Sequence, residues 1–300
     1  MQYSVIEHIR KGLIKRDFEI IQFERYCFDI AAKKRDTFIL VKILKNVDSF
    51  SSEQAEDLKR MASVLSASPI ICAIQGRNFH IACNSVYERF GIYVVHPETF
   101  LDSLDLELPF ILSKKGKNTV NIDTSHLKSL RHKLDMSFNK MSNALGISKK
   151  TIYLAEKTGR TSDYVVSAME SFFDEVIRQP IDIFSSDVSS QNHEKTSFER
   201  KVTGLTSRLG YSDFVFQTAP AKVVLKKKDM ILMCDAALKL ANDQKASDLE
   251  SLSHFCDVSS FIIVKDSQVL NVRGIAVVRV DEIKKMKSKA ELLELIYGRS

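Results

Sequence analysis

The chain has 300 residues, a length that corresponds to about two domains of roughly 150 residues each. Its hydrophobic content of 44% and charged content of 27%, with only 10 glycines and 5 prolines, exclude a disordered or collagen-like chain. Its net charge of +6 is too small to identify a partner by itself. No apolar run approaches the roughly 18 residues of a membrane-spanning helix, and the first ten residues lack the apolar core of a signal peptide. We therefore expect a soluble, cytoplasmic protein without a membrane partner.

The first third of the sequence alternates helix and strand patterns. Residues 4–15 place apolar side chains at helical spacing, and Ser51 or Ser52 caps a second helix that runs to about Ser66. Apolar strands are predicted at residues 18–23, 27–32, 38–44, 69–74 and 92–95. Continuous apolar strands that follow crossover helices are typical of a sheet covered on both faces. We therefore expect an N-terminal α/β domain.

The last third repeats this order of elements. Its predicted helices and strands lie at residues 198–209, 213–217, 221–225, 230–234, 248–255, 260–264 and 275–278, before a closing helix from Asp281. Residues 38–41 align with residues 230–233 at an offset of about 192, and residues 91–98 align with residues 274–281. A shared order with local similarity indicates that the second α/β domain duplicates the first.

The middle of the chain differs from both flanks. Residues 124–180 predict helices throughout, after a two-stranded connector at residues 110–122, and residues 185–197 have the polar composition of a linker. The fold class is therefore predicted as α/β, with two similar α/β domains flanking an all-α domain. The predicted boundaries are 1–117 (α/β), 118–182 (all-α), 183–197 (linker) and 198–300 (α/β).

The excess positive charge is confined to this middle part. Between Lys114 and Arg160 there are eleven Lys or Arg and three Asp or Glu, a net charge of +8, which leaves −2 for all other residues. A local positive field suits a polyanion, because neutralised phosphates release condensed counterions.

A helix-turn-helix pattern lies within the basic segment. Ser137 is placed to cap a short helix whose buried side carries Met141, Ala144 and Leu145, and Gly146 ends it because it adopts positive φ at little cost. In the second half of the pattern, Ile147 fills the turn, Ser148 caps a new helix, and Ile152 and Ala155 face inward.

These residues resemble the lambda-repressor and Cro type of helix-turn-helix domain. The resemblance is carried by residues 130–131, 136–137, 145–148 and 151–152 and by Glu156. Phe138 departs from it, because that family often has a phosphate-contacting Gln there. The layout of the whole chain is similar to a family of archaeal helix-turn-helix transcriptional regulators of about this length. The resemblance implies binding to double-stranded DNA and regulation of transcription.

The predicted recognition helix would place its N-terminal residues against base edges in the major groove. The candidates for base contact are Lys149, Lys150, Thr151 and Tyr153. The candidates for phosphate contact are Lys114, Lys115, Lys117, Lys140, Lys157 and Arg160. The residues expected to maintain the motif are Ser137, Met141, Leu145, Gly146, Ile147, Ser148, Ile152 and Glu156.

No metal or cofactor is expected. The five cysteines and seven histidines show no ligand spacing. Residues 28–44 nevertheless resemble restriction-endonuclease-like and Holliday-junction-resolvase-like domains, which use an Asp on one strand and an acid-x-Lys triplet on the next to hold Mg²⁺. Asp29 supplies the first acid, but Lys42-Ile43-Leu44 stands where the triplet is expected, and the second copy offers only Ala221 and Cys234-Asp235-Ala236. The α/β domains are therefore predicted to be non-catalytic.

Two functions follow from these observations. The first is a DNA-binding regulator, not an enzyme, that acts as a homodimer because one helix-turn-helix reads half a site, with α/β domains that dimerise or sense a small-molecule effector. Pairing of the two α/β copies within one chain would instead give a pseudo-symmetric monomer. The alternative function is a metal-dependent nuclease with a helix-turn-helix targeting domain.

Overall fold

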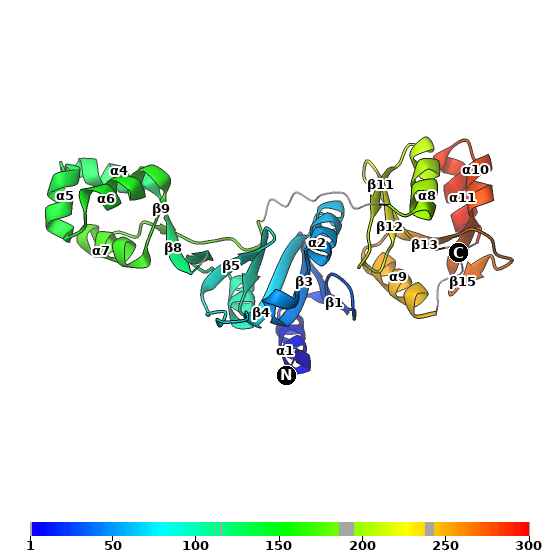
Figure 1. Ribbon diagram of the computed structural model, residues 1–300, viewed down its shortest axis with the longest axis horizontal. Helices are drawn as coiled ribbons and strands as arrows, with labels where there is room; N and C mark the ends of the chain where they lie inside the picture. The colour runs from blue at the N-terminus through cyan, green and yellow to red at the C-terminus, as the bar shows by residue number, and fades with distance from the viewer. Residues whose placement is uncertain (1, 115, 186–194, 238–242, 300) are drawn as a thin grey trace. The chain divides into compact units, whose positions relative to one another are not determined.

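The computed structural model describes residues 2–114, 116–185, 195–237 and 243–299 (Figure 1). The chain forms two compact units, one of Met1–Gly12, Ile43–Ser49 and Ile70–Ser186 and the other of Leu13–Lys42, Phe50–Pro69 and Asp187–Ser300. None of the helices in the described ranges is long and apolar enough to cross a membrane.

Helices are distributed over both units. In chain order they are α1 (Gln2–Lys15), the short 3-10 helix η1 (Val47–Ser49), α2 (Ser52–Leu65), α3 (Pro97–Leu104), α4 (Thr124–Lys133), α5 (Phe138–Leu145), α6 (Lys149–Thr158), α7 (Asp163–Phe173), α8 (Ser197–Arg208), α9 (Asp243–Phe255), α10 (Val280–Lys285) and α11 (Lys289–Tyr297).

The strands make the chain a mixed α/β protein. In chain order they are β1 (Glu19–Gln22), β2 (Ile30–Lys34), β3 (Thr37–Asn46), β4 (Ser68–Gln75), β5 (Ser85–Arg89), β6 (Ile92–Val95), β7 (Ile111–Lys114), β8 (Lys117–Ile122), β9 (Arg160–Thr161), β10 (Arg178–Gln179), β11 (Ser212–Val215), β12 (Val223–Lys227), β13 (Met230–Ala237), β14 (Ser259–Val264), β15 (Asn271–Val272) and β16 (Ile275–Arg279).

In the first unit, a sheet leads into a group of four helices. β4 pairs with β6 in parallel, β6 with β5 antiparallel and β5 with β7 in parallel. β7 and β8 form a hairpin, and β8 also pairs with the short strands β9 and β10. Figure 1 shows β8 running from β5 to the group of helices α4–α7. β8 therefore leads directly into the helical group.

The second unit contains one complete sheet and an antiparallel meander. β1, β2 and β3 pair antiparallel in chain order. The six-stranded sheet has the order β11-β12-β13-β14-β16-β15, in which the β13–β14 and β14–β16 pairs are parallel. Its core is apolar, and Val202, Leu225, Phe261 and Ile283 are fully buried in it.

The two α/β segments share strand pairings that differ by a constant offset. Hairpin β2–β3 closes with the pair Lys34–Thr37 and hairpin β12–β13 with the pair Lys227–Met230. The offset is thus 193, one residue more than the sequence comparison predicted. Side chains alternate between the two faces of a strand. With the offset of 193, each residue of the first segment is therefore matched with a residue on the opposite strand face from the one that the offset of 192 gave.

Two lysines at equivalent positions make reciprocal contacts within the second unit. Lys33 on β2 donates to the carbonyl oxygen of Phe255 at the end of α9, at 2.9 Å. Lys226 on β12 donates to the carbonyl oxygen of Val64 at the end of α2, at 3.0 Å. Each α/β segment therefore contributes a lysine to the end of a helix in the other.

A buried carboxylate on α2 extends this contact. Asp57 Oδ2 accepts hydrogen bonds from the backbone nitrogens of Gln217 and Thr218, at 2.8 and 2.6 Å, and from Thr218 Oγ1 at 2.8 Å. Its other oxygen accepts from Arg60 Nη1 at 3.1 Å, and that nitrogen also donates to the carbonyl oxygen of Val215. Asp57 and Arg60 are 0% and 2% exposed, so both charged side chains are removed from solvent.

Several predicted elements need correction. The stretch 124–180 is not helical throughout, because β9 and β10 interrupt it. β5 has no predicted counterpart, α9 begins at Asp243 rather than Asp248, and the closing helix is divided into α10 and α11. The predicted linker falls largely on residues 186–194, which lie outside the described residues.

Candidate nucleic-acid interface

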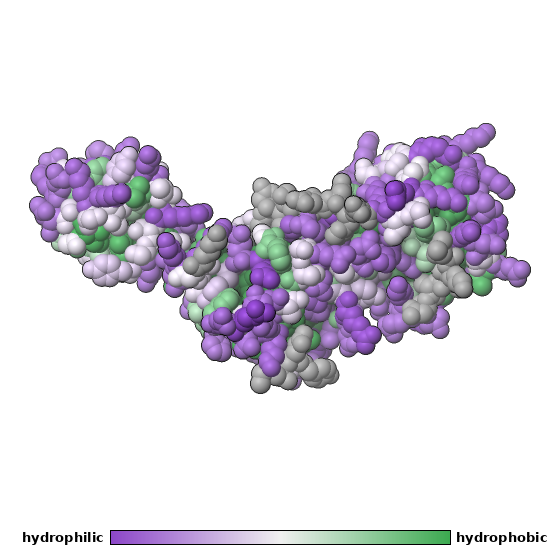
Figure 2. All heavy atoms as spheres, viewed as in Figure 1, coloured by the Kyte–Doolittle hydropathy of each residue, from purple (hydrophilic) through white to green (hydrophobic). Residues whose placement is uncertain are grey.

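The four helices α4–α7 share a small apolar core. Its members include Leu127, Leu130, Met141, Ile147, Ile152, Ala155, Val165, Val166 and Met169. Figure 2 shows hydrophilic side chains over most of the visible surface of this group, with smaller apolar patches between them. The core is contributed by all four helices, so the group holds α5 and α6 in a fixed relation.

Local hydrogen bonds and one glycine define the two ends of α5. Ser137 Oγ accepts from the backbone nitrogen of Lys140, which caps the helix, and Gly146 ends it with φ of 66°. Ser142 Oγ donates to the carbonyl oxygen of Ile147 at 2.7 Å and so braces the turn. The predicted inner face is wrong at Ala144, which is exposed, because the core lies on the side of Met141.

α6 begins immediately after this turn. Ser148 Oγ accepts from the backbone nitrogen of Thr151 at 3.1 Å, and the two hydroxyls lie 2.8 Å apart. Ile152 and Ala155 are buried, whereas Lys149 and Lys150 are exposed. No acidic residue lies in the first turn, so two cations and the free backbone N–H groups of the helix N-terminus face solvent together.

Glu156 is held inside the helical group by Arg131. Arg131 donates from Nε to Glu156 Oε2 at 2.8 Å and from Nη2 to Oε1 at 3.0 Å. Arg131 also donates to the carbonyl oxygen of Met136, and its hydrogen bonds to Glu156 raise the pKa of the guanidinium. Both side chains are 12% exposed. This bidentate pair ties α4 to α6, so the carboxylate of Glu156 is not presented to a ligand.

The ring of Tyr153 is packed rather than free. It meets Phe138 edge to face, with centroids 5.7 Å apart, and Lys157 Nζ lies 5.7 Å from its centroid. Arg131 in turn covers the ring of Phe138 at 4.4 Å. Phe138 therefore has a packing role in this chain, and Tyr153 presents only part of its surface, being 44% exposed.

Leu154 is an exposed side chain that the sequence analysis did not select. It is 42% exposed, next to Tyr153 on α6. The sequence pattern indicates this exposure, because successive helix residues are rotated by about 100° and Leu154 therefore lies about 200° around α6 from the buried Ile152. An exposed leucine on this face can make an apolar contact with the methyl group of a thymine.

The structure does not bring all the predicted phosphate contacts together. Arg160 donates from Nε to Asn121 Oδ1 at 3.1 Å and Lys140 donates to the carbonyl oxygen of Asp135, and both are exposed beside the helices. Lys117 lies at the far end of β8, four residues or about 13 Å from the Asn121 position.

The other two hairpin lysines differ from Lys117. Lys114 forms an ion pair with Glu88 on β5, with Nζ and Oε2 3.3 Å apart. Lys115 lies outside the described residues. The helical group therefore gathers Lys140, Lys157 and Arg160, while Lys114 and Lys117 lie on the hairpin.

The nuclease-like residues do not form a metal site. Asp29 and Lys42 are paired at 2.9 Å, and the two side chains are 9% and 8% exposed. With Lys42 in the lysine position, the acid position two residues earlier is occupied by Leu40, which is fully buried. With Lys42 read as the lysine of the motif instead of the start of the triplet at residues 42–44, the acid is again missing. Across the described ranges, no group of three acidic, His or Cys side chains is close enough to hold a metal.

The second α/β segment carries the opposite charges at the equivalent positions. An offset of 193 places Lys222 where Asp29 stands and Asp235 where Lys42 stands. Burial raises the pKa of Asp235, against the opposing effect of Lys245 and Lys222. Its Oδ2 is buried without a hydrogen-bond partner among the described residues. Each segment therefore has one carboxylate and one lysine at these two positions.

Comparison with known proteins gives two kinds of match. A model described as a PD-(D/E)XK superfamily domain matches residues 2–109. Three proteins named "Putative HTH-type transcriptional regulatory protein" align over most of the chain. That of Methanocaldococcus jannaschii is 32% identical over 91% of this chain and 89% of its own. That of Pyrococcus furiosus is 30% identical over 92% of this chain and 90% of its own. That of Methanococcus maripaludis is 32% identical over 91% of this chain and 81% of its own. No solved structure matches the chain.

Proposed function

Because the chain belongs to the family of archaeal proteins that bear the name "Putative HTH-type transcriptional regulatory protein", we propose that it is a sequence-specific, DNA-binding regulator of transcription and not an enzyme. The observation that carries the proposal is the α5–turn–α6 arrangement, in which Gly146 and Ser148 separate two helices packed on one core. This arrangement supports a helix-turn-helix, and the sequence pattern supports the Cro type.

In this proposal the N-terminus of α6 enters the major groove. Lys149 and Lys150 donate to guanine, Leu154 meets thymine methyl groups, and the hydroxyl of Tyr153 makes a polar contact. Thr151 contributes less, because its hydroxyl is bound to Ser148. The net charge of +8 between residues 114 and 160 supplies the attraction to phosphates.

The expected result separates base contacts from phosphate contacts. Lys149→Ala should weaken binding to the preferred duplex by about 1–3 kcal/mol and affect a scrambled duplex little, because a base contact acts only where the right base is present. Arg160→Ala should weaken binding to both duplexes alike and lower the salt slope by about one. Binding titrations at several salt concentrations, on a duplex selected from a random library by the wild-type protein, measure both effects.

Two further variants make this test specific. Tyr153→Phe keeps the packing on Phe138 and removes only the hydroxyl, so it should change the preference between duplexes more than the affinity for random DNA. Lys45→Ala removes the same charge from an exposed position on β3 and serves as the control. Equal losses for Lys149→Ala and Arg160→Ala on both duplexes would contradict the assignment of α6. At saturation we expect two chains per duplex, since one chain supplies one recognition helix.

The match to a PD-(D/E)XK superfamily domain favours a metal-dependent nuclease as the second candidate function. Its chemistry would require two carboxylates on one Mg²⁺, whereas Asp29 is paired with Lys42 and the second acid position is Leu40. We therefore expect supercoiled, branched and single-stranded DNA to stay intact with the protein and Mg²⁺, as in a parallel EDTA reaction. Nicking that requires Mg²⁺ and disappears in Asp29→Ala would establish the nuclease.

The α/β segments have a structural role in this proposal. The constant offset of 193 in their hairpins and the reciprocal contacts of Lys33 and Lys226 support a duplicated domain. The proposed boundaries stay those of the sequence analysis, with residues 1–117 and 198–300 as the two copies. The reciprocal contacts of Lys33 and Lys226 favour pairing of the two copies within one chain. Two chains would then associate through other surfaces.

A further inference from the structure

The geometry points to a binding site for a flat aromatic carboxylate in a cavity of the first unit. The cavity has a volume of about 460 Å³ and lies between η1, β5, β6 and the β7–β8 hairpin. That volume is in the range of ligand pockets, which run from about 300 to 1,000 Å³. All of its lining residues belong to one compact unit.

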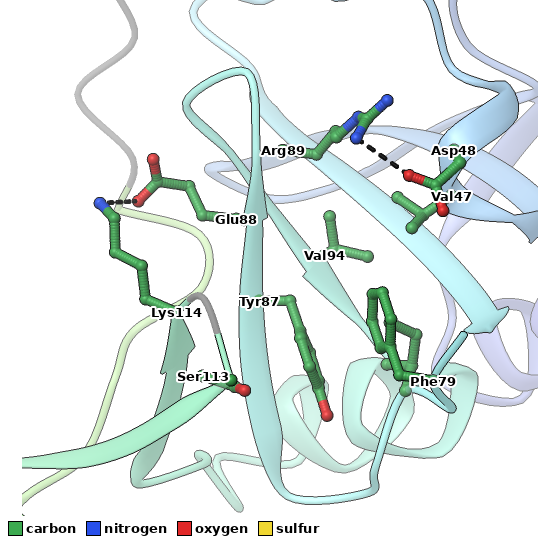
Figure 3. Close-up of a pocket in the computed structure, with 11 residues that line it drawn as sticks. Val47, Asp48, Phe79, Tyr87, Glu88, Arg89, Val94, Ser113 and Lys114 are labelled. Carbon is green, nitrogen blue, oxygen red and sulfur yellow. Dashed lines mark hydrogen bonds and ion pairs between the residues drawn. The ribbon is translucent and has the colours of Figure 1, made fainter. Parts of the chain in front are cut away.

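Two aromatic rings form the wall of the cavity. Phe79 and Tyr87 stack with centroids 5.7 Å apart and planes inclined by 24°. Figure 3 shows the two rings lying side by side, with Val94 beside them. Val47, Ile81 and Val94 complete an apolar surface and are each less than 5% exposed. Phe79 itself is 45% exposed, which leaves an aromatic surface for a planar ligand.

The polar groups of the cavity have more donors than acceptors. Asp48 Oδ1 accepts from Arg89 Nη1 at 3.0 Å, and Asp48 Oδ2 accepts from the backbone nitrogen of Arg77 at 2.7 Å. Glu88 is paired with Lys114. Both carboxylates are thus engaged, whereas Arg89 Nε is buried and no acceptor among the described residues contacts it. A buried donor without a partner is unfavourable.

This imbalance selects the charge of the ligand. A carboxylate brings acceptor oxygens, and a guanidinium binds a carboxylate with two parallel hydrogen bonds. Lys114 retains donors besides the one that it gives to Glu88. A cationic ligand would be repelled by Arg89 and Lys114, and a neutral amide would offer Arg89 an acceptor oxygen without the charge of a carboxylate. The ring of the ligand would pack on Phe79 and Tyr87 and its carboxylate would meet Arg89.

The position of the cavity connects it to the DNA-binding helices. Ser113, Lys114 and Gly116 line it from the β7–β8 hairpin. β8 ends at Ile122, and the next residue, Asp123, caps α4 through a hydrogen bond to the backbone nitrogen of His126. A ligand that contacts Lys114 therefore acts on the strand that leads into α4. The effect of this ligand on DNA rests on the proposed function, but its binding does not.

The test uses 2-naphthoate as the probe and the uncharged 2-naphthamide as its matched control. Binding to the full chain without DNA is measured by calorimetry. We expect naphthoate to bind at least about tenfold more tightly than the amide, because only the acid supplies a charge-assisted partner for Arg89. Equal affinity of the two probes, or no heat from either at millimolar concentration, would overturn the site.

Variants locate the site. Arg89→Gln and Tyr87→Leu should each weaken naphthoate binding at least about tenfold, whereas Lys45→Gln, an exposed lysine two residues from Val47, should not. Thermal unfolding verifies that each variant is folded, and the comparison of the two probes in the wild type does not depend on any variant. Unchanged naphthoate affinity in folded Arg89→Gln would place the probe elsewhere and overturn the assignment.

The effect of the probe on DNA binding is measured in a separate experiment. DNA titrations with saturating naphthoate should show an affinity shift of about fivefold or more, the range of ordinary allosteric coupling, and this shift should disappear in Arg89→Gln. Naphthoate binding without a shift in DNA affinity would reject the regulatory role and keep the site. Absence of DNA binding would reject the proposed function and leave the ligand site standing.

Discussion

Replacement of Asp57 by alanine is expected to lower the free energy of unfolding by about 3–5 kcal/mol, because it removes the carboxylate that compensates the buried Arg60 and accepts from several buried donors. Asp57 receives three hydrogen bonds from Gln217 and Thr218 and one from Arg60. Arg60 is 2% exposed, so water cannot replace the lost carboxylate. Denaturant titrations followed by circular dichroism measure the change.

Two variants on the same helix serve as controls. Glu53→Ala removes an exposed carboxylate from the first turn of α2 and should change stability by at most about 1 kcal/mol. Asp57→Ala combined with Arg60→Met should recover part of the loss, since it also removes the uncompensated charge. A loss for Asp57→Ala no larger than that for Glu53→Ala would show that this network does not stabilise the chain.

Lys42→Ala is expected to destabilise the protein by a similar amount, about 3–5 kcal/mol, because the buried carboxylate of Asp29 would lose the ammonium group that compensates its charge. The second α/β segment suggests a rescue, since Lys222 and Asp235 stand at the same two positions with opposite charges. Asp29→Lys combined with Lys42→Asp should therefore be more stable than the sum of the two single changes predicts. A double-mutant cycle of unfolding free energies measures this coupling.

Lys45→Ala is the matched control for this pair, because Lys45 lies three residues further along β3 and is exposed. We expect it to stay within about 0.5 kcal/mol of the wild type, as surface substitutions usually do. A swapped pair as unstable as the sum of its single variants would show that the charges at positions 29 and 42 do not stabilise each other.

The sequence predicted the elements that have strong local signals. Gly146 and Ser148 locate the turn between α5 and α6, and the apolar run at residues 92–95 coincides with β6. β5 was missed because Tyr87, Glu88 and Arg89 give it little apolar content. The start of α9 was missed because polar residues form its first turn.

The contacts of the site depend on register and tertiary packing, which local patterns do not encode. Lys42 pairs with Asp29 only because the β2–β3 hairpin brings the two side chains together. The same holds for Arg131, whose partner Glu156 lies 25 residues away in the chain. The sequence selected Glu156 as structural, but it offered no sign that Phe138 would pack between Arg131 and Tyr153.

The reciprocal lysine contacts have a consequence for how this protein can change in evolution. In a dimer of identical chains, every substitution at the interface occurs on both sides at once, and the interface must remain complementary to itself. When both halves are encoded in one chain, each position mutates alone. In the duplicated domain that we propose, Asp57 with its donors at Gln217 and Thr218 and the reversed charges at Asp29 and Lys222 are differences that a symmetric dimer of identical chains could not accumulate. A duplication of this kind removes a constraint of symmetry and leaves each half free to specialise.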